Sequence, residues 1–136
     1  MGNLNFAWGT MATIRPKRDE DREERITMEI IVDAYDAEEQ AMGWYYYLEE
    51  QLQFPFTAIC ITKRATSPLH VKEKVKVIGM ALENECHIEM MVSIQWEDED
   101  LAVPLSQLKA VNTVPKRTKQ AIEDWHYWVK TDYQFG

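Results

Sequence analysis

The segment from Asp36 to Gln53 constrains the fold most, because its apolar residues recur at helical rather than strand spacing. Residues three or four positions apart lie on the same side of a helix. The apolar residues with this spacing are Ala41, Tyr45, Leu48 and Leu52. The segment therefore predicts an amphipathic helix with one face buried against the rest of the domain.

Both ends of this helix are marked in the sequence. Asp33 or Asp36 can act as the N-cap, and Asp36 with Glu39 has the spacing of a capping box. Pro55 ends the helix, since the residue before a proline avoids the α region. Gly43 lies inside the helix, where glycine costs about 1 kcal/mol relative to alanine. We therefore expect a close contact between backbones at this glycine.

The residues before this helix lack a sustained period. A mixed charge run from Arg15 to Glu24 is typical of a mobile tail, because it buries too little apolar surface to offset chain entropy. Apolar residues alternate from Ile26 to Val32, which favours a short strand, with a helix as the alternative. We predict a mobile charged N-terminal tail over residues 1–24 and a single domain over residues 25–136.

Short β segments follow the helix. Residues 56–62 are apolar and β-branched, residues 71–81 alternate, and residues 89–96 form a strong strand pattern before an acidic turn at 97–100. Within the second segment, Gly79 is typical of a β-bulge. Two shorter strands are expected at residues 101–104 and 110–111.

A second helix is predicted to start near Thr118, with an apolar stripe formed by Ile122, Trp125 and Val129. The full pattern predicts an α+β fold. We expect a small SH3-like β-barrel of about five strands, flanked by an N-terminal and a C-terminal helix. The helices would cover openings or edges of the barrel.

Charge and cysteine usage exclude several classes of protein. The chain of 136 residues has a net charge of −8, which argues against binding to nucleic acid or to an anionic membrane surface. No segment has the length and apolar character of a membrane span or the core of a signal peptide. Cys60 and Cys86 are far apart and fit buried free thiols of a reducing compartment. We therefore expect a cytoplasmic protein.

Catalysis is not indicated. The chain has only five glycines, no glycine-rich loop and no recognisable Ser/His/Asp arrangement, so we expect no enzyme. His70, His87 and His126 are isolated in the sequence. Cys86 and His87 are adjacent, but zinc needs three or four ligands and the other cysteine lies on a predicted strand.

The aromatic run from Trp44 to Tyr47 covers more than one face of its helix. Packing against the second helix, with its Trp125, Tyr127 and Trp128, is the favoured interpretation. The alternative is an exposed aromatic patch, which would make the domain an SH3-like module for a protein partner without a metal.

Carboxylates are the remaining candidates for a site. Antiparallel connections bring the end of the first helix to the same end of the barrel as the loop after residue 81. The acidic residues at that end are Glu49, Glu50, Glu83, Glu85 and Glu89. Ca²⁺ takes six to eight oxygen ligands and favours several carboxylates, but no EF-hand loop is present. From composition alone, a solvated surface is slightly favoured over a calcium site.

The acidic turn Glu97–Asp100 lies at the opposite end of the predicted barrel. Consecutive side chains near strand ends point to opposite faces, so its four acids cannot all bind one ion. A solvated hairpin turn is the favoured interpretation.

Several segments resemble the CcbP-type calcium-binding protein family, found in cyanobacteria and other bacteria. They are residues 28–36, 41–50, 54–56 and 77–81, Cys86, and residues 89–92, 101–108 and 124–128, and the resemblance covers about residues 25 to 133. It implies a cytoplasmic protein that binds Ca²⁺ through clustered carboxylates without an EF-hand, in a sequestering or signalling role.

The resemblance also implies where the ion binds. The acidic pair that ends the first helix matches Glu49 and Glu50, and the acids before the loop cysteine match Glu83 and Glu85. An aspartate is expected in some relatives where this chain has Glu50, and the longer side chain changes the distance of the ion from the backbone. We predict Ca²⁺ binding by these residues together with Glu89.

Overall fold

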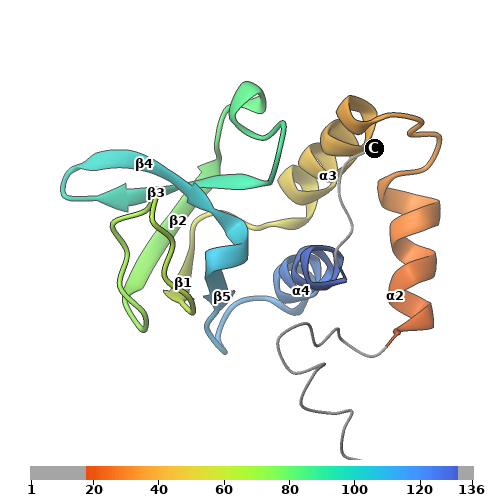
Figure 1. Cartoon of the computed structure of the whole chain (residues 1–136). Coiled ribbons are helices and arrows are strands. Elements are labelled where there is room, and N and C mark those ends of the chain that lie inside the picture. The colour runs from red at the N-terminus through yellow and green to blue at the C-terminus, as the bar shows by residue number, and fades with distance from the viewer. Residues whose placement is uncertain (1–17, 132–136) are drawn as a thin grey trace, which may run out of the picture.

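The computed structural model describes residues 18–131 and has an α+β architecture (Figure 1). The helices lie beside one another on one side of a five-stranded antiparallel sheet. The helical elements are α2 (Glu20–Arg25), the π-helix η2 (Ile26–Ile30), α3 (Ala37–Gln51), the 3₁₀ turns η3 (Glu83–Glu85) and η4 (Leu105–Gln107), and α4 (Lys116–Lys130). The strands are β1 (Phe56–Cys60), β2 (Lys74–Met80), β3 (Met91–Trp96), β4 (Glu99–Pro104) and β5 (Leu108–Ala110).

The sheet is strongly curved but not closed. Its strand order is β4-β3-β2-β1-β5, so β4 and β5 are the two edges and do not pair with each other among the described residues. A flat sheet would hold these edges about 19 Å apart, at about 4.8 Å per strand. Only the three residues of η4 join them, a rise of about 6 Å. The sheet must therefore bend, but the predicted barrel closure is not formed.

The N-terminal part of the domain is helical, so the predicted strand at residues 26–32 is wrong. Ile26 and Ile30 are buried, whereas Met28 and Val32 are 63% and 50% exposed. The apparent alternation therefore contains an i, i+4 pair, which is the contact spacing of a helix. The helix predicted as the alternative for this segment is the one that forms.

The predicted tail is also shorter than expected. The Asp19 carboxylate accepts a hydrogen bond from the backbone N–H of Arg22 and caps α2, so residues 19–24 form ordered structure. The rest of the predicted tail, residues 1–17, lies outside the described residues. Arg22 in the charge run and Arg25 just after it both bind a buried carboxylate on α4, described below, and this holds the segment against the domain as a helix.

The helix α3 begins where the sequence predicts and ends two residues before the expected Gln53. Asp36 is its N-cap, with its carboxylate accepting from the Glu39 backbone N–H at 2.8 Å. The Glu39 carboxylate in turn accepts from the Tyr35 backbone N–H. Gln51 is the last helical residue, before Pro55. The other helix, α4, starts at Lys116, two residues earlier than expected, because Pro115 occupies its N-cap position.

Both singled-out glycines have the predicted roles. A Cβ on Gly43 would collide with the backbone carbonyl of Ile30, so η2 and α3 approach each other through their backbones there. At Gly79, the register between β2 and β3 shifts after Val77, as expected of a bulge. A Cβ added to Gly79 would meet no atom within 4 Å.

Aromatic packing joins α3 to α4. The Trp44 ring lies 5.0 Å from that of Trp125 and 5.7 Å from that of Trp128, measured between centroids. Trp44 is fully buried and Tyr45 nearly so, while Tyr46 is 53% exposed. The helix packing predicted for this run is confirmed, and no contiguous patch of exposed rings remains on it.

Candidate functional site

The C-terminal half of α3 contacts the loop between β2 and β3. Tyr45 donates a hydrogen bond from its hydroxyl to the carbonyl of Ala81 at 2.9 Å. Tyr46 donates to the Glu83 carboxylate at 3.1 Å. The sheet register explains this contact, since Phe56 at the start of β1 pairs with Val77 near the end of β2.

The carboxylates of Glu49 and Glu83 both affect the pKa values of these tyrosines. The hydrogen bond to Glu83 raises the pKa of Tyr46, as do the charge of Glu83 and, to a smaller extent, that of Glu49. Burial raises the pKa of Tyr45 most, followed by the charge of Glu49. Glu49 from α3 and Glu83 from the loop therefore act on the same two hydroxyls.

The turn η3 carries Glu83 and Glu85 on either side of Asn84. The Glu85 carboxylate accepts a hydrogen bond from the Leu82 backbone N–H at 3.2 Å and so folds back over the start of the turn. Glu83, Asn84 and Glu85 are all exposed. Their oxygens are accessible to solvent and to a cation.

Glu50 lies on a different side of α3 from Glu49. Successive residues of an α-helix point about 100° apart. Glu50 lines a shallow notch of about 340 Å³ between η2 and α3, together with Glu29, Gly43 and Tyr47. Tyr46 also lines this notch, and its hydroxyl contacts Glu83. Tyr46 therefore lies between Glu50 and Glu83.

Glu89 is already paired with a cation. Arg64 donates to its carboxylate from both terminal nitrogens, at 2.7 Å and 3.3 Å. These hydrogen bonds raise the pKa of Arg64. A bidentate arginine offsets the charge of Glu89 and occupies the oxygens that a calcium ion would need.

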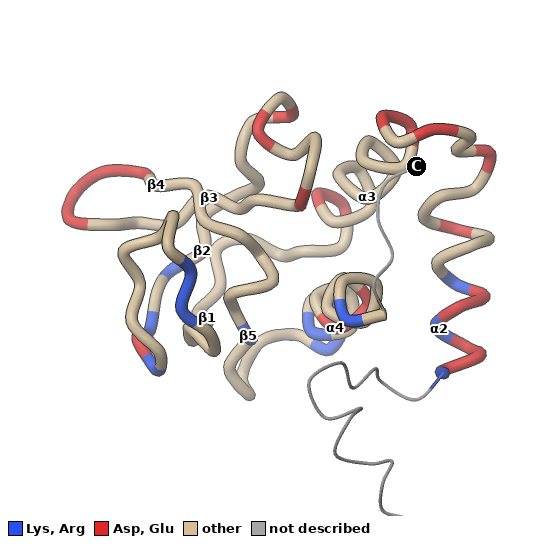
Figure 2. Tube along the Cα trace, in the orientation of Figure 1, with Lys and Arg blue, Asp and Glu red and all other residues tan. Residues whose placement is uncertain are grey.

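The predicted ligands offer the right chemistry without a preformed cage. Hard carboxylate and amide oxygens are the donors that Ca²⁺ prefers. Within residues 18–131, however, no three His, Cys, Asp or Glu side chains converge on a point that would hold a metal. Figure 2 shows the acidic residues of the β2–β3 loop and of the end of α3 as separate short segments.

The acidic turn between β3 and β4 projects from the far end of the sheet (Figure 2). Glu97 and Asp98 adopt positive φ angles of 46° and 71° and all four acids from Glu97 to Asp100 are exposed. This geometry matches the solvated hairpin turn that the sequence favoured.

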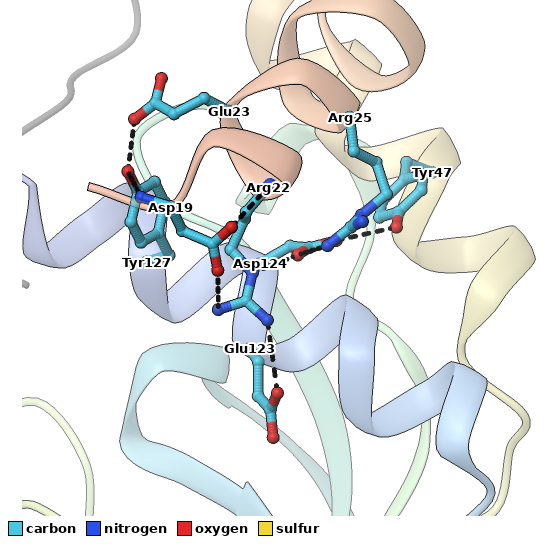
Figure 3. Close-up of polar contacts among 8 residues, drawn as sticks. All are labelled: Asp19, Arg22, Glu23, Arg25, Tyr47, Glu123, Asp124 and Tyr127. Atoms are coloured by element: carbon cyan, nitrogen blue, oxygen red, sulfur yellow. Dashed lines mark hydrogen bonds and ion pairs between the residues drawn. The ribbon is translucent and has the colours of Figure 1, made fainter. Parts of the chain in front are cut away.

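Sequence reasoning missed the one buried carboxylate of the described residues, Asp124 on α4. It is completely inaccessible and lies between two arginines of α2 (Figure 3). Arg22 donates to it at 2.8 Å from Nε, and Arg25 donates at 2.9 Å from Nε and 2.7 Å from Nη2. The hydroxyl of Tyr47 donates a further bond at 3.0 Å.

This cluster ties α2, α3 and α4 together. The bond to Asp124 raises the pKa of Arg25, and burial raises that of Tyr47. With two guanidinium groups beside it, Asp124 has no capacity left for calcium. The sequence carried a signal, because Arg22 and Arg25 are spaced for one helical face and Asp124 interrupts an aromatic stripe.

None of the described helices is both long and apolar enough to cross a bilayer. Cys60 and Cys86 are both buried free thiols.

Residues 24–129 match the profile of the Calci_bind_CcbP family, which is described as calcium binding. Among solved structures, the crystal structure of CcbP from Anabaena is 43% identical and superimposes with a TM-score of 0.79, over 88% of this chain and 98% of that chain. A calcium-binding protein in its calcium-binding form is also 43% identical, with a TM-score of 0.76 over 87% and 96% of the two chains. A comparison with curated proteins finds no match.

Proposed function

Because this chain belongs to the CcbP family of calcium-binding proteins, we propose that it binds Ca²⁺ through exposed carboxylates where α3 meets the β2–β3 loop. The family match covers almost all of the described domain, and the relatives at 43% identity include a protein in a calcium-binding form. The family is one of calcium-binding proteins and not of enzymes. The bound ion is the protein's cargo or signal, and no reaction is assigned to it.

The observation that supports the placement is the hydrogen bond from Tyr46 to Glu83. It holds a loop carboxylate against α3, where the charge of Glu49 acts on the same hydroxyl, and Glu85 lies two residues later in the same turn. These three residues form the centre of the proposed site, with the Asn84 side chain as a neutral oxygen donor. Since residues 18–131 form no preformed cage, calcium binding would draw the exposed side chains together and order the loop.

The two other predicted ligands have smaller roles in this proposal. Glu50 lies beyond Tyr46, beside Glu29, so it contributes negative potential unless its side chain turns around the helix. Glu89 holds Arg64 and supports the base of the loop. The site thus contains fewer carboxylates than the sequence suggested, which favours a weak, exchangeable site suited to buffering or signalling.

Isothermal titration with Ca²⁺, and with Mg²⁺ as the control ion, tests the function. We expect heat of binding and a higher melting temperature with Ca²⁺, because a ligand bound only by the folded state stabilises it. Neither heat nor a thermal shift at millimolar Ca²⁺ would refute calcium binding by this chain.

Variants then test the placement. Glu49→Gln, Glu83→Gln and Glu85→Gln should each weaken Ca²⁺ binding, whereas Glu97→Gln in the opposite turn removes the same charge and should leave it nearly unchanged. Glu89→Gln should have a small effect. Full affinity in all of the first three variants, or an equal loss in Glu97→Gln, means that the ion binds elsewhere.

We further propose that the protein acts in the cytoplasm and that its curved sheet is an open relative of the SH3-like barrel. The two buried free thiols support the first point, since a reducing compartment keeps cysteines unpaired. The strand order, with a 3₁₀ turn joining the two edge strands, supports the second. The alternative of an aromatic interaction module is not favoured, because Trp44 and Tyr45 are buried.

A further inference from the structure

Two stretches of this acidic chain carry a net positive charge. Residues 51–72 and residues 101–122 contain no Asp or Glu at all, although the chain as a whole has 23 acidic and 15 basic residues. The fold places these stretches side by side. Ile59 of β1 pairs with Lys109 of β5, and the N–H of Ile61 donates to the carbonyl of Gln107 at 2.8 Å.

A groove of about 510 Å³ lies where these stretches meet α4. One wall carries Ile61 and Lys109 from the sheet. The other carries Lys119, Ile122, His126 and Lys130 from α4. Positions 119 and 130 are eleven residues apart, which brings them to the same face of the helix after three turns. Figure 2 shows basic residues on α4, away from the acidic loops of the sheet.

Two of the three lysines of the groove lie at opposite ends of its α4 wall. Lys119 and Lys130 are separated by about 16 Å along the helix axis, at about 1.5 Å per residue. The Lys119 ammonium donates to the carbonyl of Asn112 at 2.6 Å, which fixes it at one end. Neither Lys109 nor Lys130 forms an ion pair with any residue between 18 and 131. Both are available to a negatively charged ligand.

We propose that this groove binds a short acidic segment of a partner protein in an extended conformation. Five extended residues at about 3.3 Å each span the 16 Å between the end lysines. Carboxylates at the ends and the middle of such a segment would meet Lys119, Lys109 and Lys130. Apolar side chains between them would contact Ile61, which is 40% exposed.

One acidic residue also borders the groove. Glu123 is 63% exposed in its side chain, and Arg22 Nη2 contacts its carboxylate at 3.4 Å, which offsets its charge. The net charge of −8 opposes a long polyanion, because nucleic acid would extend beyond the groove over acidic surface. A five-residue segment stays within the groove, and acids more than about 8 Å away are screened at physiological salt.

Fluorescence anisotropy with the full chain tests this proposal. The probe is a fluorescein-labelled pentapeptide of alternating glutamate and leucine, titrated in EDTA so that calcium plays no part. We expect saturable binding that weakens with salt. The triple variant Lys109→Gln/Lys119→Gln/Lys130→Gln should bind at least about tenfold more weakly, since three ion pairs are lost.

The matched control is Lys63→Gln/Lys74→Gln/Lys76→Gln, which removes the same charge outside the groove and should bind within about twofold of the wild type. The double variant Lys109→Gln/Lys130→Gln keeps the Lys119 contact with Asn112 and guards against loss of folding. Failure of the wild type to bind at millimolar probe, or an equal loss in the control, overturns the proposal. So does tighter binding of a single-stranded oligonucleotide, or self-association that the groove variants abolish, which would make a second copy the occupant.

Discussion

The hydroxyl of Tyr46 donates a hydrogen bond to the carboxylate of Glu83 at 3.1 Å, and this bond joins the exposed side of α3 to the β2–β3 loop. It brings together two parts of the chain separated by 37 positions. The tyrosine therefore reports on the charge state of the proposed calcium site.

Calcium should lower the pKa of Tyr46. Glu83 raises this pKa by accepting the hydrogen bond of the neutral phenol and by its charge, and Glu49 adds a smaller charge effect. Ca²⁺ bound by these carboxylates would offset their charge and favour the phenolate. An ultraviolet titration of tyrosinate should show one tyrosine ionising at lower pH with Ca²⁺ than with Mg²⁺. The difference should disappear in Tyr46→Phe, and a calcium effect that survives this change would place the ion elsewhere.

Gly43→Ala should destabilise the domain although alanine is the better helix former. The added Cβ would overlap the Ile30 carbonyl, and that backbone atom cannot move aside as a flexible side chain would. Overpacking of this kind costs about 1–3 kcal/mol, which exceeds the gain of about 1 kcal/mol in helix propensity. Urea denaturation measures the change. Gly79→Ala is the control, because its added methyl meets no neighbour, and a smaller loss at Gly43 than at Gly79 would contradict the backbone contact.

Asp124→Asn should reduce the free energy of unfolding by about 3–5 kcal/mol, since it removes the buried counter-charge of Arg25 and leaves Arg22 with only the more exposed carboxylates of Asp19 and Glu123. Arg22 and Arg25 have side chains only 22% and 20% exposed, so water screens them little. The neighbouring change Glu123→Gln removes an exposed carboxylate and should cost less than about 1 kcal/mol. Equal effects in chemical denaturation would show that Asp124 is not the centre of the helix contacts.

Stability should fall below about pH 6.5 because of His126. Burial lowers its pKa in the folded protein, partly opposed by its hydrogen bond with the Leu105 carbonyl. The unfolded chain therefore binds a proton at a higher pH than the folded chain. The stabilisation by neutral His126 is complete above the unfolded value of 6.5 and is lost as the pH falls toward the lower folded value. Denaturation at several pH values in this range gives the free energy of unfolding as a function of pH. This dependence should be weaker for His126→Gln than for the exposed control His87→Gln, and equal dependence in the two variants would disprove the assignment.

Local signals in the sequence predicted the main helix closely. Asp36, Glu39 and Pro55 act within a few residues of the helix ends, so neighbouring side chains and backbone sterics are sufficient to locate them. Gly43 was also informative, because an unfavourable residue inside a helix indicates a compensating contact. The alternation from Ile26 to Val32 led to the wrong prediction of a strand, since a pattern that short fits both a strand and one face of a helix.

The candidate site was predicted only in part. Strand order implied that the end of α3 meets the loop after β2, and this follows from antiparallel connections alone. The same reasoning grouped Glu50 and Glu89 with the other acids. Side-chain direction on the helix separated the first, and the bidentate pair with Arg64 neutralised the second. Neither relationship can be derived from the order of residues in the chain.

Periodicity, capping residues and composition were sufficient for the α+β class, the ends of α3, the buried aromatics and the family resemblance, because these depend on local geometry and on the total apolar content. The curvature that leaves the sheet open, the burial of Asp124 between two arginines and the partners of each carboxylate depended on the tertiary structure. A charged side chain has its chemical role set by what lies within a few ångströms of it, and in this protein those neighbours come from distant parts of the chain.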